Sequence, residues 1–103
     1  MAREVRVEGF RLPAPGGAVR LEVAGRTIAV YRVEEGLRAS DAGCPHVGGP
    51  LDRGRIVDGR VTCPWHGSQF DLATGAVVRG PATVGVRVYA VRLDGDALVL
   101  TIP

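Results

Sequence analysis

The sequence lacks two common polar residues altogether, and it has few of the residues that small proteins use for aromatic packing and for metal binding. It contains no lysine and no asparagine, and its 103 residues include five aromatics, two cysteines and two histidines. The hydrophobic core therefore has to be built mainly from valine, leucine, isoleucine and alanine. No apolar run approaches the roughly 18 residues of a membrane-spanning helix, and the N-terminal residues lack the apolar segment of a signal peptide. We expect a cytoplasmic protein without a membrane anchor.

A strong excess of one charge is also missing. Thirteen arginines stand against eleven acidic residues, which gives a formal net charge of +2. Domains that bind nucleic acids concentrate much more positive charge than this. We therefore expect no nucleic-acid partner and a surface on which charges of both signs are solvated.

The sequence does contain a regular alternation of short valine-rich runs with glycine and proline, which is typical of an all-β domain. The chain is long enough for one domain and too short for two ordinary ones. No window shows a helical period. The expected elements are a strand within 3–10, three strands within 18–40 with turns at Gly25–Arg26 and Glu35–Gly36, and a hairpin over 84–102 that turns at 94–96.

The middle of the chain differs from both ends. Residues 42–81 hold eight glycines and four prolines, and their one clear hairpin, 55–62, turns at Asp58–Gly59. We interpret this segment as a loop-rich subdomain inserted into a β-sandwich. Because it has little apolar material of its own, a metal centre is the expected means of stabilising it. The predicted division of the single domain is a base of residues 1–41 and 83–103 with a subdomain of about 42–82.

All cysteines and histidines of the chain lie in this middle segment. Their pattern is Cys44-x-His46, sixteen further residues, and then Cys63-x-x-His66. In a reducing compartment, two such cysteines indicate metal ligands or catalytic thiols rather than a disulfide. The spacing allows two loops to face each other, each presenting one thiolate and one imidazole to a common centre.

Three small residues beside these side chains fit the same role. Gly48 and Gly49 lack side chains, so the backbone can approach a bulky cluster and offer it N–H groups. The hydroxyl of Ser68 could donate a hydrogen bond to a sulfur and stabilise a reduced, more negative state. Two other kinds of site stay open: a structural zinc site of two cysteines and two histidines, and a catalytic Cys63–His66 pair, for which no third residue is evident.

The segments CPHVGGPL and CPWHGSQFD resemble the two cluster-binding loops of Rieske [2Fe–2S] proteins. The resemblance implies an all-β Rieske fold with one [2Fe–2S] cluster per chain. It also implies that Cys44 and Cys63 bind one iron and that His46 and His66 bind the other. Neutral histidines in place of two thiolates make the oxidised centre less negative, which raises its potential above that of four-cysteine clusters.

Two departures narrow the resemblance. Rieske subunits of cytochrome bc complexes carry a disulfide where this chain has Gly49 and Trp65, and a tyrosine where it has Phe70. The sequence is more similar to the soluble Rieske ferredoxins of ring-hydroxylating dioxygenases, and we expect a potential in the lower half of the Rieske range. The resemblance implies a monomeric one-electron carrier between a flavin-dependent reductase and an oxygenase or other oxidoreductase. It implies no enzyme activity, because no histidine is left for a mononuclear iron site.

Alternatives remain for the function and for several side chains. The chain could instead be a small Rieske subunit of a larger oxidoreductase, like those of nitrite reductases or arsenite oxidases, or a zinc-stabilised interaction module without a redox role. Trp65 could screen the cluster, contact a partner or form a hydrophobic plug, whereas Phe70 and Leu51 are expected in the local core. The arginines of the segment either dock an acidic partner or are ordinary solvated charges; they are Arg53, Arg55, Arg60 and Arg79.

Overall fold

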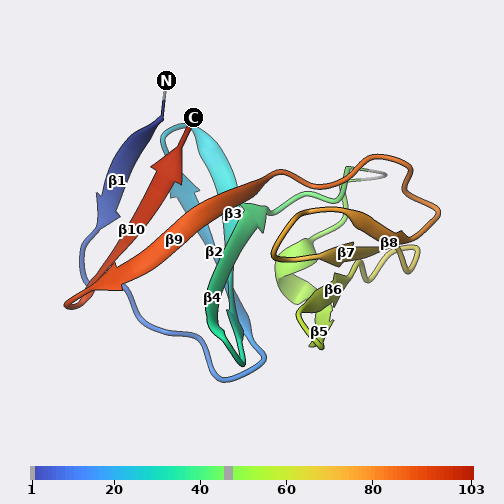
Figure 1. Cartoon of the computed structure of the whole chain (residues 1–103), viewed down its shortest axis with the longest axis horizontal. Coiled ribbons are helices and arrows are strands. Elements are labelled where there is room, and N and C mark those ends of the chain that lie inside the picture. The colour runs from blue at the N-terminus through green and yellow to red at the C-terminus, as the bar shows by residue number, and fades with distance from the viewer. Residues whose placement is uncertain (1, 46–47) are drawn as a thin grey trace.

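The computed structural model describes residues 2–45 and 48–103, and these residues form two antiparallel β-sheets side by side (Figure 1). The larger sheet has the strand order β1-β10-β9-β4-β3-β2 and the smaller one β5-β6-β7-β8. The only helical element among the described residues is a single 3₁₀ turn, so the prediction of an all-β fold is confirmed. The elements are β1 (Arg3–Val7), β2 (Ala18–Val23), β3 (Arg26–Val33), β4 (Gly36–Asp41), η1 (Leu51–Arg53), β5 (Arg55–Val57), β6 (Arg60–Thr62), β7 (Gln69–Asp71), β8 (Val77–Arg79), β9 (Val88–Asp94) and β10 (Ala97–Ile102).

The six-stranded sheet forms the base of the molecule and encloses its own core. Alternate residues of its strands point inward, as expected for a half-buried strand. The buried members of this core are Val23, Ile28, Val30, Ala39, Tyr89, Leu98, Leu100 and Ile102. Six of these eight residues are valine, leucine or isoleucine, as the shortage of aromatics requires.

The first two turns of the base lie one residue earlier than the sequence predicted. The β2–β3 hairpin turns at Ala24–Gly25, whose φ angles are 52° and 76°, and the β3–β4 hairpin pairs Val33 with Gly36 around Glu34–Glu35. A two-residue hairpin with positive φ at both turn positions matches the twist of the flanking strands. Alanine rarely adopts positive φ, so the prediction placed Gly25 first in the turn. In the structure Gly25 is the second turn residue and follows Ala24.

Strand β3 connects the two parts of the molecule because both of its faces are buried. Ile28 and Val30 point into the base core, whereas Ala29 and Tyr31 point into a second core under the smaller sheet. The Tyr31 hydroxyl is 2.8 Å from the buried Ser40 Oγ, which satisfies both polar groups. One strand thus serves as the floor of the inserted part.

The inserted part has more regular structure than the sequence predicted. Its hairpin does turn at Asp58–Gly59, with φ angles of 53° and 72°, but two further strands, β7 and β8, complete a small sheet. The expectation that it has little apolar material is wrong: its core contains Leu51, Val61, Phe70, Leu72, Ala82 and Val86, together with both cysteines. Leu51 and Phe70 are fully buried, as predicted.

Polar contacts also join the two parts. The Arg20 guanidinium of β2 lies 2.7 Å from the carboxylate of Asp52 in η1. Residues 80–87, which lead from β8 to β9, lie against the small sheet, where the Val86 N–H donates to the Gly75 carbonyl at 2.8 Å. No helix of the described part of the chain is long and apolar enough to cross a membrane.

Candidate metal centre

The two loops that carry the predicted ligands have the same backbone hydrogen bonds. In the first loop, the Cys44 N–H donates to the Gly49 carbonyl at 2.9 Å, and the Cys44 carbonyl accepts from the Gly48 N–H at 2.7 Å. In the second, the Cys63 N–H donates to the Ser68 carbonyl at 2.8 Å, and the Cys63 carbonyl accepts from the Gly67 N–H at 3.1 Å. Each cysteine therefore starts a tight loop closed by the same pair of hydrogen bonds.

A glycine occupies the fourth position after each cysteine for a conformational reason. Gly48 has a φ of 74° and Gly67 a φ of 80°, in the left-handed region that glycine adopts without strain. The Gly48 N–H was predicted to donate to a cluster. In the structure it donates instead to the Cys44 carbonyl inside its own loop. The glycine at each site thus lets the chain turn back after presenting its ligands.

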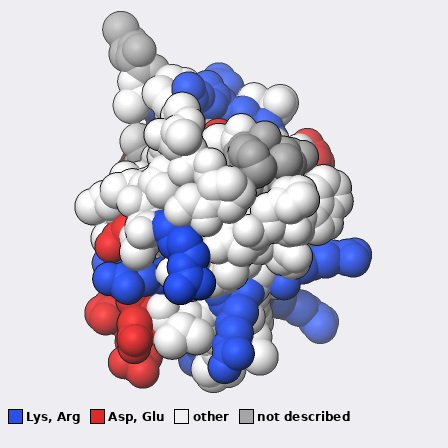
Figure 2. Space-filling model, turned by 90° about the vertical axis from the view of Figure 1, so that its right-hand side faces the viewer, with Lys and Arg blue, Asp and Glu red and all other residues white. Residues whose placement is uncertain are grey.

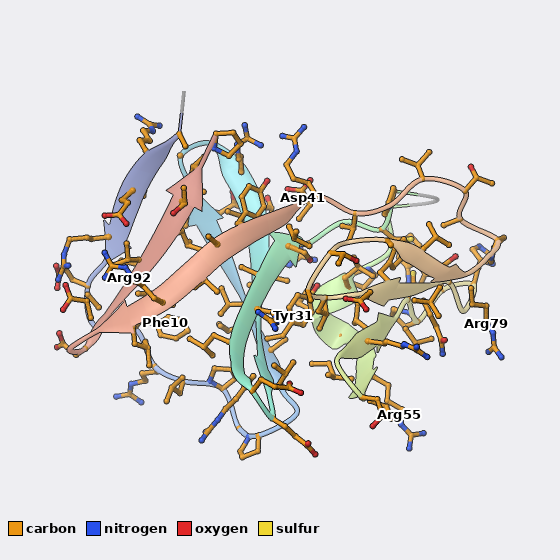
Figure 3. All side chains as sticks on the ribbon, viewed as in Figure 1. Phe10, Tyr31, Asp41, Arg55, Arg79 and Arg92 are labelled. Carbon is orange, nitrogen blue, oxygen red and sulfur yellow. The ribbon has the colours of Figure 1, made fainter. Side chains whose placement is uncertain are left out.

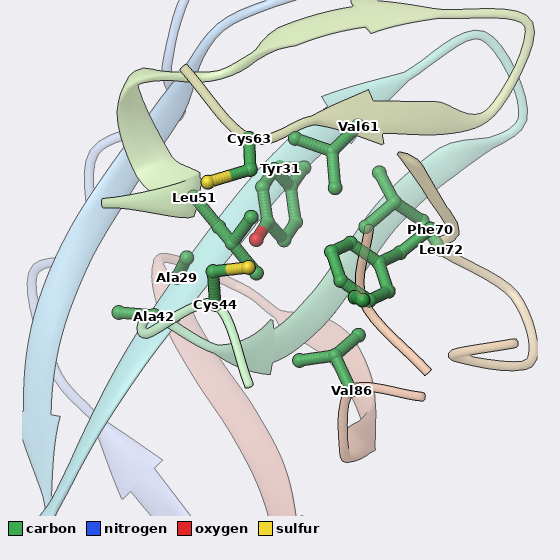
Figure 4. Packing of buried hydrophobic residues seen from close by; sticks show 11 residues of the cluster. Ala29, Tyr31, Ala42, Cys44, Leu51, Val61, Cys63, Phe70, Leu72 and Val86 are labelled. Carbon is green, nitrogen blue, oxygen red and sulfur yellow. The ribbon is translucent and has the colours of Figure 1, made fainter. Parts of the chain in front are cut away.

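The two loops touch each other at Gly49. A Cβ atom built on this buried residue would lie 2.7 Å from the Cys63 sulfur and 3.2 Å from the Trp65 ring. Only a residue without a side chain allows this approach. Cys44 and Cys63 are 3% and 1% exposed, and Figure 4 shows them among Leu51, Tyr31 and other members of the second core.

Ser68 connects the second ligand loop to a third segment of the chain. Its side chain is 1% exposed, and its Oγ accepts a hydrogen bond of 3.0 Å from the Ala82 N–H. A serine hydroxyl has one hydrogen and two lone pairs, so accepting from Ala82 leaves the hydroxyl hydrogen available for donation. This role of Ala82 has no signal in the sequence, because a backbone N–H is the same at every residue except proline.

The remaining residues of the second loop lie at the surface. His66 is exposed, and Trp65 is 57% exposed, so its interpretation as a hydrophobic plug is wrong. His46, the other predicted histidine ligand, lies outside the described residues. Within the described part of the chain, no three histidine, cysteine, aspartate or glutamate side chains gather as ligands of a single metal ion.

The described residues fit a [2Fe–2S] cluster in their chemistry and in their packing. Thiolate sulfur is the donor that iron–sulfur clusters take from proteins, and each loop supplies one buried cysteine. Because Gly49 has no Cβ atom, the space beside the Cys63 sulfur stays free of side-chain atoms from the first loop. Ser68 adds a buried hydroxyl to the second loop. An apolar wall around such a centre limits access of water and so influences its potential.

Comparisons with known proteins agree with this arrangement. A model of the Rieske [2Fe–2S] domain matches residues 6–90. The anthranilate 1,2-dioxygenase ferredoxin subunit of Burkholderia cepacia is 42% identical over 79 residues, which cover 75% of this chain and 73% of that one.

Two solved structures are similar in fold as well. The ferredoxin of carbazole 1,9a-dioxygenase from Nocardioides aromaticivorans IC177 superposes with a TM-score of 0.84 at 30% identity, covering 94% of this chain and 95% of that one. A chain from a complex of reduced oxygenase and oxidized ferredoxin in carbazole 1,9a-dioxygenase superposes with a TM-score of 0.78 at 30% identity. The match covers 84% of this chain and 82% of that one.

Proposed function

We propose that this chain, which belongs to the Rieske [2Fe–2S] domain family, passes electrons from a flavin-dependent reductase to a terminal oxygenase. As a member of that family it holds a [2Fe–2S] cluster and acts as a one-electron carrier. The observation that carries the proposal is the 42% identity with a ferredoxin subunit of a dioxygenase, over three quarters of this chain. A similar chain occurs in a complex of oxygenase and ferredoxin, which supports an oxygenase as the acceptor.

The proposal assigns the cluster to four side chains. Cys44 and Cys63 would bind one iron, and His46 and His66 the other. The cluster supplies reversible one-electron exchange when it is bound. The two cysteines lie in the core and keep water from their sulfurs, whereas the exposed position of His66 allows a partner to approach the imidazole directly.

Ser68 has a separate part in this assignment. Its oxygen is held by the Ala82 N–H, so its hydrogen can be directed at a cluster sulfur. A hydrogen bond of this kind favours the reduced state, which carries more negative charge. We propose that Gly48 and Gly49 contribute through backbone shape rather than through their chemistry, and that the cluster-binding part extends from about residue 42 to about residue 82.

A free monomer in the cytoplasm is the form in which a carrier can exchange partners, and we propose this state for the protein. The chain catalyses no reaction of its own. Its two histidines are both assigned to the cluster, so it has none for the mononuclear iron site of a terminal oxygenase.

Two measurements test the proposal. Voltammetry of the purified holoprotein should give a potential in the lower half of the Rieske range, which spans roughly −150 to +300 mV. The holoprotein should also restore product formation when it replaces the ferredoxin in a purified dioxygenase system of the anthranilate type. A potential at the upper end, or no electron transfer from any flavin-dependent reductase despite an intact cluster, would contradict it.

A further inference from the structure

One face of the small sheet is open, and the residues on it are mostly polar. Residues directly opposite each other on neighbouring strands point to the same side of a sheet. Ile56, Val61, Phe70 and Val77 pair in register and point into the second core. The next row of paired residues therefore points outward: it consists of Arg55, Thr62 and Gln69, with Arg79 opposite Gln69 across a β-bulge in β8.

A second outward row lies beside the first. Val57 pairs with Arg60, and Arg60 pairs with Asp71. Arg55, Arg60 and Arg79 are all exposed, and Figure 3 shows the labelled Arg55 and Arg79 projecting away from the sheet. We refer to the three arginines with Thr62 and Gln69 as the arginine face.

Within residues 2–45 and 48–103, none of the ion pairs involves Arg55, Arg60 or Arg79. The ion pairs given by the described residues involve Arg6, Arg20 and Arg92, which all belong to the base. Two carboxylates lie on the open side: Asp58 lines the hollow there, and Asp71 accepts hydrogen bonds from the Ala73 and Thr74 N–H groups at 2.8 and 3.2 Å. These guanidinium groups therefore present their donors to solvent, in the planar geometry that matches a carboxylate.

The arginine face adjoins the second ligand loop. Thr62 precedes Cys63 and Gln69 follows Ser68, and the Gln69 amide donates to the Thr62 hydroxyl at 3.2 Å across the base of the loop. A surface hollow of about 420 Å³ lies over the same strands. Its lining residues are Arg55, Val57, Asp58, Arg60, Thr62 and Gln69. A molecule seated here would lie beside the loop that holds Cys63 and His66.

We propose that the arginine face is a docking surface for an acidic protein surface, whose aspartate and glutamate carboxylates pair with Arg55, Arg60 and Arg79. The proposal rests on the proposed function, since the partner would be the electron donor or acceptor. Figure 2 shows the end of the molecule that carries the small sheet: a broad uncharged surface, with several arginine side chains projecting from its lower half and most of the acidic side chains at the lower left. The modest net charge of +2 favours a protein over a nucleic acid as the partner.

Complementary charge of this kind mainly raises the rate at which partners meet and fixes their orientation. Such an arrangement suits a carrier that must bind and release quickly. It also predicts that binding weakens as salt is added, because exposed charges are screened.

The test uses the holoprotein and a fluorescent peptide of ten glutamates as the acidic probe, with binding followed by anisotropy at low ionic strength. The variant R55Q/R79Q removes two charges from the arginine face, and R3Q/R11Q removes two from exposed positions of the base. We expect the first variant to bind the peptide about fivefold more weakly and the second less than about twofold. The cluster absorbance should be unchanged in both, so a loss of binding reports docking and not loss of the cluster.

Three outcomes would overturn the proposal: no binding by the wild type, equal weakening in both variants, or tighter binding of a single-stranded oligonucleotide that is lost in R55Q/R79Q. None of them bears on the proposed function, which fails only if the cluster or its electron transfer is missing.

Discussion

Gly49 of the first ligand loop lies so close to Cys63 of the second that a Cβ atom on Gly49 would be 2.7 Å from the Cys63 sulfur. Two loops far apart in the sequence are thus held in direct contact at the sulfur that is assigned to the cluster. Because a contact of this length forces atoms to move, the size of residue 49 controls the distance between the loops.

Replacement of Gly49 by alanine should therefore impair cluster binding. We expect a lower iron content in the purified protein and a decrease of about 1–3 kcal/mol in the free energy of unfolding, as for other overpacked sites. Iron analysis and thermal unfolding measure the two effects. The matched control is Gly43→Ala in the same loop, because its Cβ would find no atom nearer than 4.0 Å. Equal iron content in both variants would contradict the role of Gly49.

Replacement of Ser68 by alanine should lower the reduction potential. The change removes the hydroxyl hydrogen that favours the reduced state and leaves the buried Ala82 N–H without its acceptor, which costs about 1–3 kcal/mol of stability. The control is Ser40→Ala, which removes another buried hydroxyl, bonded to Tyr31 in the core of the molecule. Voltammetry should show a lower potential for Ser68→Ala alone. A decrease of the same size in the reduction potential of Ser40→Ala would show that the effect comes from loss of stability and not from the Ser68 hydroxyl.

Trp65 provides an optical signal of the same site. It is the only tryptophan of the chain, and its ring lies near Gly49, beside Cys63. Energy transfer to the coloured cluster should quench its fluorescence, and chelation of the iron should restore it. Because the side chain is 57% exposed, the recovered emission should resemble that of an indole in water. Equal emission from the holoprotein and the iron-free protein would place the cluster elsewhere.

The two tyrosines make stability depend on alkaline pH. Burial raises the pKa of Tyr31, and burial together with the hydrogen bond to the Asp41 carboxylate raises the pKa of Tyr89, both from an ordinary value of 10.0. The unfolded chain therefore loses these protons at a lower pH than the folded one. Their contribution to stability is complete below pH 10.0 and decreases as the pH rises above it.

Phenolate absorbance and circular dichroism, recorded together during an alkaline titration, test this relation. The phenolate signal of the folded protein should appear at a higher pH than that of a free tyrosine, because the pKa values of both side chains are raised. Full ionisation of both tyrosines near pH 10.0 in a protein with native circular dichroism would show that they are not protected.

Local patterns predicted those features that depend on neighbouring residues in the chain. The Asp58–Gly59 turn follows from two residues that tolerate positive φ, and each ligand loop is closed by bonds between residues at most five positions apart. The three-residue strands β7 and β8 were missed, because three residues are too few to show a period of two. Their pairing is decided by the core around Phe70 and Val61, which forms only when distant segments meet.

Other features depend on backbone contacts that side-chain identity does not encode. The Ala82 N–H reaches Ser68 only because residues 80–87 fold back over the small sheet, and no residue type in that segment marks which backbone N–H is the donor. Similarly, the open side of the small sheet becomes evident only from the register that places Arg55, Thr62, Gln69 and Arg79 in one row. The arginines could be listed from the sequence, but their common face could not.

Pulsed electron paramagnetic resonance of the chemically reduced holoprotein tests the central claim most directly. An iron–sulfur centre with two cysteine and two histidine ligands should give a signal from one unpaired electron that is coupled to two imidazole nitrogens, and both couplings should be altered when His66 is replaced by cysteine. A reduced protein without a signal, or a signal without coupling to imidazole nitrogen, would contradict the assignment of Cys44, His46, Cys63 and His66 as the ligands.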